Sequence, residues 1–341
     1  MISKSRNVIQ NGNFDVWQRG TTFTGVASTT YVADRWKVLK NSDGVFDVLQ
    51  NATNPNNASL YNLQFDVTTA DGTVGAANYI ILQHAIEGNF FMSVRDKPMT
   101  LSFWTKAKKT GINCIALLSS AGDETFIAEY TVNTTATWEK KVIQIPPIPA
   151  WTWGTGTGVA AYLRFCVYCG STSGDGAVGW QAAAKISTAN QVNNMDSTDN
   201  YVQYSQVQLE AGSSATEFEV MDPTDVLSTC QRYLVTHGGG TAYDRVGGGF
   251  LPTSAIASVV STLPTTMRAT PTIGYDAVGS WCCQYGSNQL TACTAIAIQN
   301  STTKVLGLNV TGTLTPFTTG EAFFMSANNT TAARLYVSSE I

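Results

Sequence analysis

Residues 59–67 of the chain read SLYNLQFDV, a stretch in which apolar and polar side chains alternate. In an extended chain, every second side chain lies on the same face, which here gathers Tyr61, Leu63, Phe65 and Val67. Residues 100–107, TLSFWTKA, alternate in the same way and place Leu101, Phe103 and Thr105 opposite Ser102, Trp104 and Lys106. A period of two is typical of a strand with one face on a core and the other in solvent. The two stretches are therefore predicted to be strands.

Similar segments recur along the chain and are separated by turn-forming clusters. Alternation returns at 140–148 (KKVIQIPPI) and 201–210 (YVQYSQVQLE), whereas 51–57 (NATNPNN) and 171–176 (STSGDG) favour turns. Short strands joined by such turns are typical of a β-sandwich or a jelly roll. We therefore expect an all-β protein whose N-terminal domain is a jelly-roll β-sandwich.

A single helix is expected between two β-rich regions. Asp222 suits the N-cap and Pro223 the first helical position, and the following apolar residues recur at helical spacing until GGG at 238–240. Strand patterns resume beyond the glycines. The sequence predicts a jelly-roll domain in residues 1–221, a short linking α-helix in residues 222–237, and a smaller C-terminal β-sandwich in residues 238–341.

Composition and charge exclude several classes of partner. The 341 residues include 43% hydrophobic but only 13% charged side chains, about half the usual share of roughly 25%. The net charge is −4, and no basic stripe is present to neutralise phosphates, which argues against nucleic acid as a partner. No stretch approaches the roughly 20 apolar residues of a membrane span, and no signal peptide is visible, so we expect synthesis in the cytoplasm.

The sequence gives little support to catalysis. Its two histidines, His84 and His237, have no nucleophile or metalloprotease motif around them, and no P-loop occurs. Scattered acids such as Glu124 could pair for glycoside hydrolysis, but solvated or salt-bridged acids are far more common. We expect a protein that is not an enzyme and that holds no cofactor.

The seven cysteines cannot all pair within one chain. Cys166 and Cys169 form a C-x2-C, but regular alternation would place them on opposite faces of a strand, and no second ligand pair completes a zinc site. Cys282, Cys283 and Cys293 are candidates for a hairpin disulfide or a cross-link between subunits, with buried free thiols as the alternative.

Aromatic residues beside glycine-rich loops are the candidates for glycan binding. Trp151 and Trp153 lie two residues apart in PAWTWGTGTG, residues 149–158, and would share a face if this segment is extended. Trp281 and Tyr285, in SWCCQYG at 280–286, form a second candidate pair. Rings of this kind offer a sugar an apolar surface on which to stack, although packing in a core or against a neighbouring subunit is the alternative.

The stretch NGNFDVWQRG, residues 11–20, combines a turn dipeptide with aromatic residues. We expect Asn11-Gly12 to form a turn and Phe14 and Val16 to share one side of a following strand, with Asp15 and Trp17 on the other. Because Trp and Phe mostly supply core area, a structural role in starting the sandwich is favoured over direct binding.

Ordered segments of the chain resemble phage virion proteins, namely tail fibres and carbohydrate-binding tail proteins. The resemblance is carried by residues 11–25 (NGNFDVWQRGTTFTG), 31–38 (YVADRWKV), 82–107, 201–220, 230–234 (CQRYL), 267–273 (MRATPTI) and 333–341 (ARLYVSSEI), and so covers nearly the whole chain. It implies a jelly roll similar to carbohydrate-binding modules, followed by a small β domain, on a virus particle.

Carbohydrate-binding jelly rolls often hold a structural calcium ion between their first and last strands. Asn11, Asn13, Asp15 and Glu210 supply oxygen donors in roughly those places. The closing strand, however, has Ser205 and Gln206 where such modules often place an acid, which argues against calcium.

We therefore expect a non-enzymatic structural component of a phage virion: a fibre, spike or appendage on the tail, collar or head. Its expected partners are other virion proteins, two further copies in a homotrimer, and a host-surface polysaccharide. Because the jelly roll begins close to residue 1, with no stem ahead of it, docking would use the domain itself or residues 1–8. The alternatives are a decoration or collar protein that binds no ligand and, less favoured, a polysaccharide depolymerase.

Overall fold

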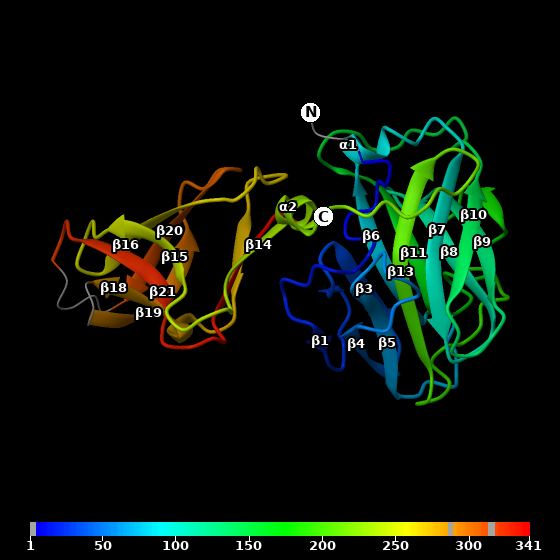
Figure 1. The fold of residues 1–341 in the computed structure, drawn as a ribbon, viewed down its shortest axis with the longest axis horizontal. Coiled ribbons are helices and arrows are strands. Elements are labelled where there is room, and N and C mark those ends of the chain that lie inside the picture. The colour runs from blue at the N-terminus through cyan, green and yellow to red at the C-terminus, as the bar shows by residue number, and fades with distance from the viewer. Residues whose placement is uncertain (1–4, 286–288, 313–317) are drawn as a thin grey trace. The chain divides into compact units, whose positions relative to one another are not determined.

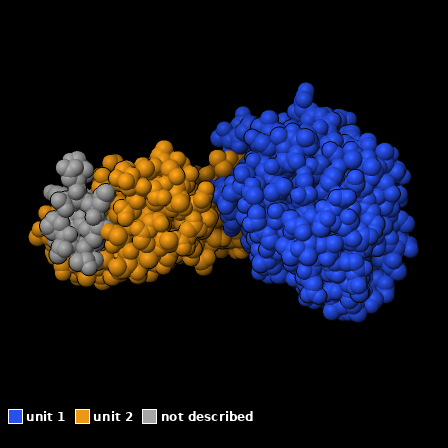
Figure 2. All heavy atoms as spheres, turned by 90° about the horizontal axis from the view of Figure 1, so that it is seen from below, with its two compact units in different colours: residues 1–226, 341 blue, residues 227–340 orange. Residues whose placement is uncertain are grey.

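The computed structural model describes residues 5–285, 289–312 and 318–341, and the chain divides into two compact units. Unit 1 comprises residues 1–226 together with Ile341, and unit 2 comprises residues 227–340 (Figure 2). Strands dominate both units, and all their pairings are antiparallel (Figure 1). The expected all-β class is confirmed. No helix among the described residues is both long and apolar enough to span a membrane.

Unit 1 contains two sheets. The first, called sheet A, has the strand order β1 (Thr22–Phe23), β4 (Val45–Asn51), β5 (Asn62–Thr69), β13 (Tyr201–Ala211), β7 (Met99–Ala107) and β10 (Glu139–Ile145). The second, called sheet B, has the order β12 (Gly179–Gln181), β9 (Thr125–Val132), β8 (Gly111–Ser119), β11 (Val159–Cys169), β6 (Tyr79–Glu87), β3 (Trp36–Asn41) and β2 (Thr30–Tyr31). A short helix, α1 (Gly88–Phe91), follows β6.

The alternating residues of SLYNLQFDV and TLSFWTKA build the core of unit 1 as expected. Leu63 and Phe65 on β5, and Leu101 and Phe103 on β7, are buried in one apolar cluster that also contains residues of sheet B, including Phe165 on β11. The rings of Phe103 and Phe165 meet edge to face, with centroids 5.0 Å apart. The two sheets therefore pack against each other as a sandwich.

The NGNFDVWQRG stretch is part of this core but is not a strand. Asn11, with a φ of 53°, lies in the turn that was expected at Asn11-Gly12, but Phe14 also has a positive φ, of 56°, where the following strand was expected. Phe14 is fully buried against Trp36, with ring centroids 4.8 Å apart, and the Trp36 indole donates to the Asn11 carbonyl. The Gly12 carbonyl accepts from Val207 of β13, which fastens the stretch to sheet A. Its expected structural role is confirmed, but the predicted strand is wrong.

The helix α2 spans Pro223–Gln231 and is shorter than the expected 222–237. The chain changes at Leu234 to strand β14 (Leu234–Gly238), which pairs with β22 (Arg334–Ser338), itself paired with β17 (Thr272–Tyr275). Leu234 and Val235 are buried on this three-stranded sheet, so pairing with β22 overrides the helical spacing of the apolar residues.

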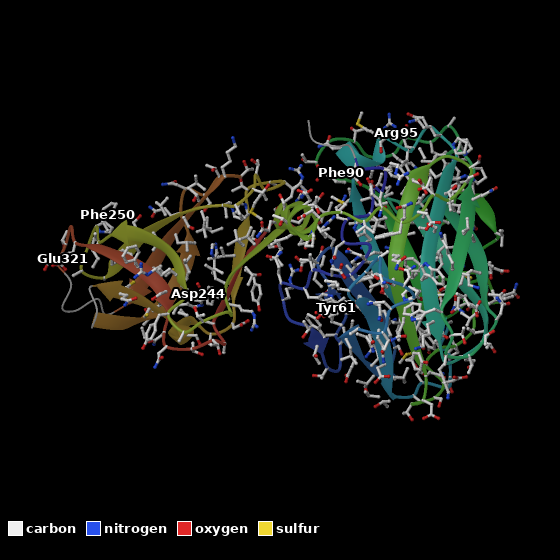
Figure 3. All side chains as sticks on the ribbon, viewed as in Figure 1. Tyr61, Phe90, Arg95, Asp244, Phe250 and Glu321 are labelled. Atoms are coloured by element: carbon white, nitrogen blue, oxygen red, sulfur yellow. The ribbon has the colours of Figure 1, made fainter. Side chains whose placement is uncertain are left out.

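The remaining strands of unit 2 close into a barrel rather than the two-layered sandwich that was expected. The order around it is β15 (Arg245–Phe250), β16 (Ile256–Thr262), β20 (Val305–Gly312), β19 (Gln289–Ile298), β18 (Trp281–Tyr285) and β21 (Ala322–Ala327), with a short 3₁₀ helix (Val278–Ser280) before β18. Closure is achieved by β15, which pairs with both β16 and β21. Phe250 of β15 and Glu321, which precedes β21, lie at the same end of the barrel (Figure 3).

Two glycines of β15 explain how the barrel closes so tightly. A Cβ atom on Gly249 would lie only 1.7 Å from the Ser258 carbonyl oxygen on β16, and one on Gly247 would lie 2.5 Å from the Val260 carbonyl oxygen. Only glycine lets the two backbones approach this closely.

Candidate functional site

Trp153, a glycan-binding candidate from the sequence, is a core residue. Its side chain is 4% exposed, and its ring stacks on Phe91, with centroids 5.3 Å apart and planes 14° from parallel. Its Nε1 donates a 2.6 Å hydrogen bond to the Glu124 carboxylate. Neither face of the ring is open to a sugar, which corrects the expectation for this residue.

Trp151 is half-buried and does not form a platform with Trp153. Both rings meet Trp180 edge-on instead, each with centroids 5.7 Å apart, and the segment around them is not a strand. The two-residue spacing therefore does not place the rings on one exposed face. Trp281 is fully buried in the core of unit 2, so it too is not available for glycan binding. The side chain of Tyr285 lies outside the described residues.

Three of the four candidate calcium ligands, Asn11, Asp15 and Glu210, accept hydrogen bonds from other groups of the protein. Asn11 accepts from the Val16 amide, and Asp15 accepts from the amides of Leu60 and Tyr61 at 3.0 Å each. Glu210 accepts from both the amide and the hydroxyl of Thr216.

Asn13 donates to Asp15. Burial raises the pKa of Asp15. Within residues 5–285, 289–312 and 318–341, no group of three or more His, Cys, Asp or Glu side chains forms a metal site.

All seven cysteines lie in the described part of the chain and are free. Cys282, Cys283 and Cys293 are buried in the barrel as free thiols, in agreement with the alternative to a disulfide or a cross-link. The neighbouring Cys283 thiol raises the pKa of Cys293, so the thiol is held protonated.

Cys166 and Cys169 differ from the expected placement on opposite faces. A register shift in β11 between Cys166 and Tyr168 interrupts the alternation. A hydrogen bond from Cys166 lowers the pKa of Cys169, so the two thiols are neighbours.

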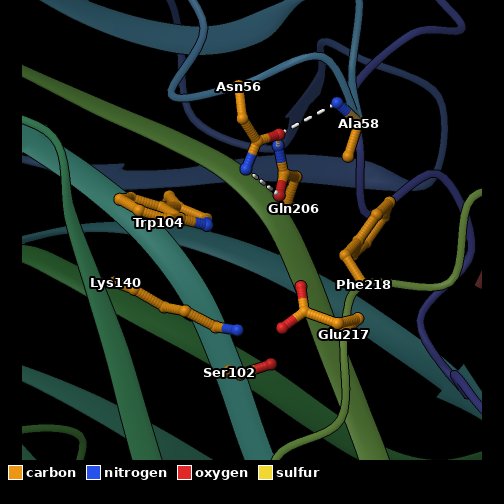
Figure 4. A pocket seen from close by; sticks show the side chains of 8 residues that line it. All are labelled: Asn56, Ala58, Ser102, Trp104, Lys140, Gln206, Glu217 and Phe218. Carbon is orange, nitrogen blue, oxygen red and sulfur yellow. Dashed lines mark hydrogen bonds between the residues drawn. The ribbon is translucent and has the colours of Figure 1, made fainter.

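A different site lies on the outer face of sheet A, where a pocket is lined by Asn56, Ala58, Ser102, Trp104, Lys140, Gln206, Glu217 and Phe218 (Figure 4). The half-buried Trp104 ring comes from β7, directly opposite Lys140 of β10 and Ser205 of β13. The pocket encloses about 70 Å³. It therefore admits the edge of a sugar ring rather than a whole small molecule.

Gln206 reaches this pocket because of an irregularity in β13. The register between β13 and β7 shifts between Ser205 and Gln208, and Gln206 has a φ of 53°. Such a β-bulge re-aims a side chain, which here leaves Tyr204 and Val207 in the core while Gln206 joins the outer face. A non-glycine residue in this conformation carries strain that is common at functional sites.

The Gln206 amide fixes the loop that forms one wall of the pocket. Its Nε2 donates to Asn56 Oδ1 at 2.6 Å and to Ser59 Oγ at 3.3 Å, and Asn56 Nδ2 donates back to Gln206 at 3.4 Å. The Ser59 and Ser205 hydroxyls lie 2.9 Å apart. A second attachment is made by Trp138, whose indole donates to the Thr53 carbonyl. The wall is therefore held against the sheet before any ligand arrives.

One feature of the sequence does indicate this site. Trp104 falls on the polar face of TLSFWTKA, between Ser102 and Lys106, and a tryptophan on the solvent side of a strand is unusual enough to mark a surface. Nothing in the sequence indicated that Asn56, Gln206 and Glu217 would meet there, because the bulge and the loop positions depend on the tertiary fold.

No protein-family model matches the chain, and no curated protein matches it in sequence. Similar solved structures include the enzymatically active domain of tailspike protein 4 of bacteriophage CBA120 (TM-score 0.34, 13% identity). That match covers 62% of this chain but only 22% of the tailspike chain.

Carbohydrate-binding modules are also among the structural neighbours. A CBM4 module has a TM-score of 0.33 and 14% identity over 60% of this chain and 99% of that chain. TmCBM61 in complex with β-1,4-galactotriose has a TM-score of 0.30 and 13% identity over 61% of this chain and 100% of that chain. Because these TM-scores are below 0.5, a function for this chain has to be argued from its own residues.

Proposed function

We propose that the chain is a non-catalytic component of a phage virion, a fibre, spike or appendage protein that binds a surface glycan in the Trp104 pocket. The observation that carries the glycan-binding part is the half-buried Trp104 ring on an outer sheet face, surrounded by hydroxyl, amide and charged groups. An apolar ring beside directed polar groups matches the two kinds of surface that a sugar presents, its C–H face and its hydroxyls.

The virion part of the proposal is supported by the ordered sequence segments that resemble phage tail proteins. Association as a homotrimer, contact with other virion proteins and location on the particle follow from the same resemblance. A mass of three times 36.5 kDa in light scattering would support the trimer, and labelling of purified particles by an antibody against the chain would support the location.

The glycan-binding part is tested on an array of bacterial surface oligosaccharides. Wild-type protein and Trp104→Ala are compared, with Trp151→Ala as the matched control because Trp151 lies outside the pocket. Removing a central aromatic should weaken binding at least about tenfold, whereas the control should bind as the wild type does.

Three other results would lead to different conclusions. An equal loss of glycan affinity in Trp104→Ala and Trp151→Ala would indicate that the binding site lies outside the pocket. The absence of binding to any glycan by the folded protein would favour a decoration or collar protein without a ligand. Shortening of the polysaccharide during incubation would favour a depolymerase over a non-catalytic protein.

A further inference from the structure

Two opposite charges line the Trp104 pocket without being paired. Lys140 extends from β10, and Glu217 comes from the segment that follows β13. Figure 4 shows the two side chains pointing toward each other, with Ser102 on the same side of the pocket. Among the described residues, neither charged group forms an ion pair. The gap between them is therefore lined by a cationic donor on one side and an anionic acceptor on the other.

The chemistry of these two groups restricts what can bridge them. An ammonium only donates hydrogen bonds, and an ionised carboxylate only accepts them. A bridging group must therefore accept from Lys140 and donate to Glu217. A sugar hydroxyl does both, and two adjacent hydroxyls can divide the tasks between them. A ligand carboxylate cannot donate to Glu217, and a ligand ammonium cannot accept from Lys140.

Charge repulsion adds to this selection. A uronic or sialic acid would bring a second negative charge beside Glu217, and an amino sugar would bring a second positive charge beside Lys140. Each charged ligand would gain one attraction and suffer one repulsion, whereas hydroxyls form a favourable charge-assisted hydrogen bond with both groups.

We infer that the pocket selects uncharged sugar residues, held by adjacent hydroxyls between Lys140 and Glu217 while the ring edge packs on Trp104. This inference rests on the proposed glycan binding and specifies its ligand class. The small volume of the pocket suits one terminal or branch residue of a polysaccharide rather than several residues of its backbone.

The test uses three oligosaccharides that differ only in the terminal residue: glucose, glucuronic acid or glucosamine. Binding to the full chain is measured by titration calorimetry. The wild type should prefer the neutral terminus by about tenfold over either charged one. Glu217→Gln should weaken neutral binding and raise the affinity for glucuronic acid relative to glucose. Lys140→Met should weaken neutral binding and raise the affinity for glucosamine relative to glucose.

Matched controls separate these effects from net charge. Lys108→Met and Asp199→Asn change the charge by the same amounts at exposed positions outside the pocket and should leave the preference unchanged. Equal or tighter wild-type binding of a charged terminus would overturn the inference, as would pocket variants that behave like the controls. If the protein binds none of the three and nothing on the array, the proposed function fails as well. If it binds all three equally, only the inferred selectivity fails.

Discussion

Gln206 donates a 2.6 Å hydrogen bond to the Asn56 side chain from a backbone with a φ of 53°. The strained residue and its partner are 150 positions apart in sequence. Their contact joins the bulge of β13 to the loop wall of the Trp104 pocket. If the strain at Gln206 serves the shape of the pocket rather than the stability of the sheet, substitutions at this position should separate the two effects.

The first prediction separates these two roles of Gln206. Glycine adopts positive φ without strain, so Gln206→Gly should change the free energy of unfolding by less than about 1 kcal/mol while weakening glycan binding. Gln206→Val should destabilise by about 1–3 kcal/mol because a β-branched residue resists this conformation. Denaturant unfolding and glycan titration of both variants check this. A glycine variant with full affinity would show that the Asn56 contact does not shape the pocket.

The second prediction concerns the buried tryptophan. Trp153→Ala should reduce the free energy of unfolding by about 3–5 kcal/mol, because it removes the stack on Phe91 and leaves Glu124 without its indole donor. Trp151→Ala should reduce the free energy of unfolding by clearly less, since that ring is only half-buried. Urea unfolding of both variants measures the difference, and equal losses would contradict the assignment of Trp153 to the core.

The third prediction is a dependence of stability on pH. Complete burial, with the nearby Arg35 charge, lowers the pKa of His84 well below its usual value. His84 of the unfolded chain therefore takes up a proton as the pH falls through about 6.5, whereas His84 of the folded chain stays neutral. The contribution of neutral His84 to the free energy of unfolding is fully present above this pH and is lost progressively below it. The expected slope is about 1.4 kcal/mol per pH unit for this residue.

Denaturant unfolding of unit 1 at pH 7.5 and pH 5.5 measures the effect, and His84→Gln should remove most of it. Burial also lowers the pKa of His237, in unit 2, so His237→Asn is the control that should leave the pH dependence of unit 1 intact. A wild type that is equally stable at both pH values would contradict the prediction.

The fourth prediction concerns the closure of the barrel. Gly249→Ala would place a Cβ atom 1.7 Å from the Ser258 carbonyl oxygen, whereas on Gly248 it would lie 3.6 Å from the Phe324 ring and 3.7 Å from the Phe323 carbonyl oxygen, both ordinary van der Waals distances. We expect Gly249→Ala to destabilise unit 2 by at least about 3 kcal/mol and Gly248→Ala to be tolerated. Limited proteolysis and thermal unfolding distinguish the two. Similar behaviour of both variants would argue against tight packing of β15 on β16.

Much of the fold was predictable because alternation reports burial directly. Leu63, Phe65, Leu101 and Phe103 were assigned to the core from a period of two, and the structure buries all four. The exceptions occur where the chain departs from regular geometry. Phe14 has a positive φ and Leu234 leaves the helical pattern for a strand, and both outcomes depend on partners distant in sequence.

The site was less predictable than the fold for the same physical reason. The sequence indicated tryptophans beside glycine-rich loops, but Trp153 and Trp281 are buried in the cores, and the ring that lines the pocket is the half-buried Trp104 on a strand. The oxygen atoms proposed for calcium accept hydrogen bonds from nearby backbone and side-chain donors instead. Residue type alone does not reveal whether a group is already satisfied by the protein.

The closed six-stranded barrel matters when many copies of the chain lie close together. In the described part of the barrel, each strand pairs with a neighbour on both sides, so none of these strands is an open edge. Open edges invite strand addition between molecules, and the hazard grows when identical chains are concentrated in one place. If many copies share a particle, their barrels can lie close together without adding strands to one another.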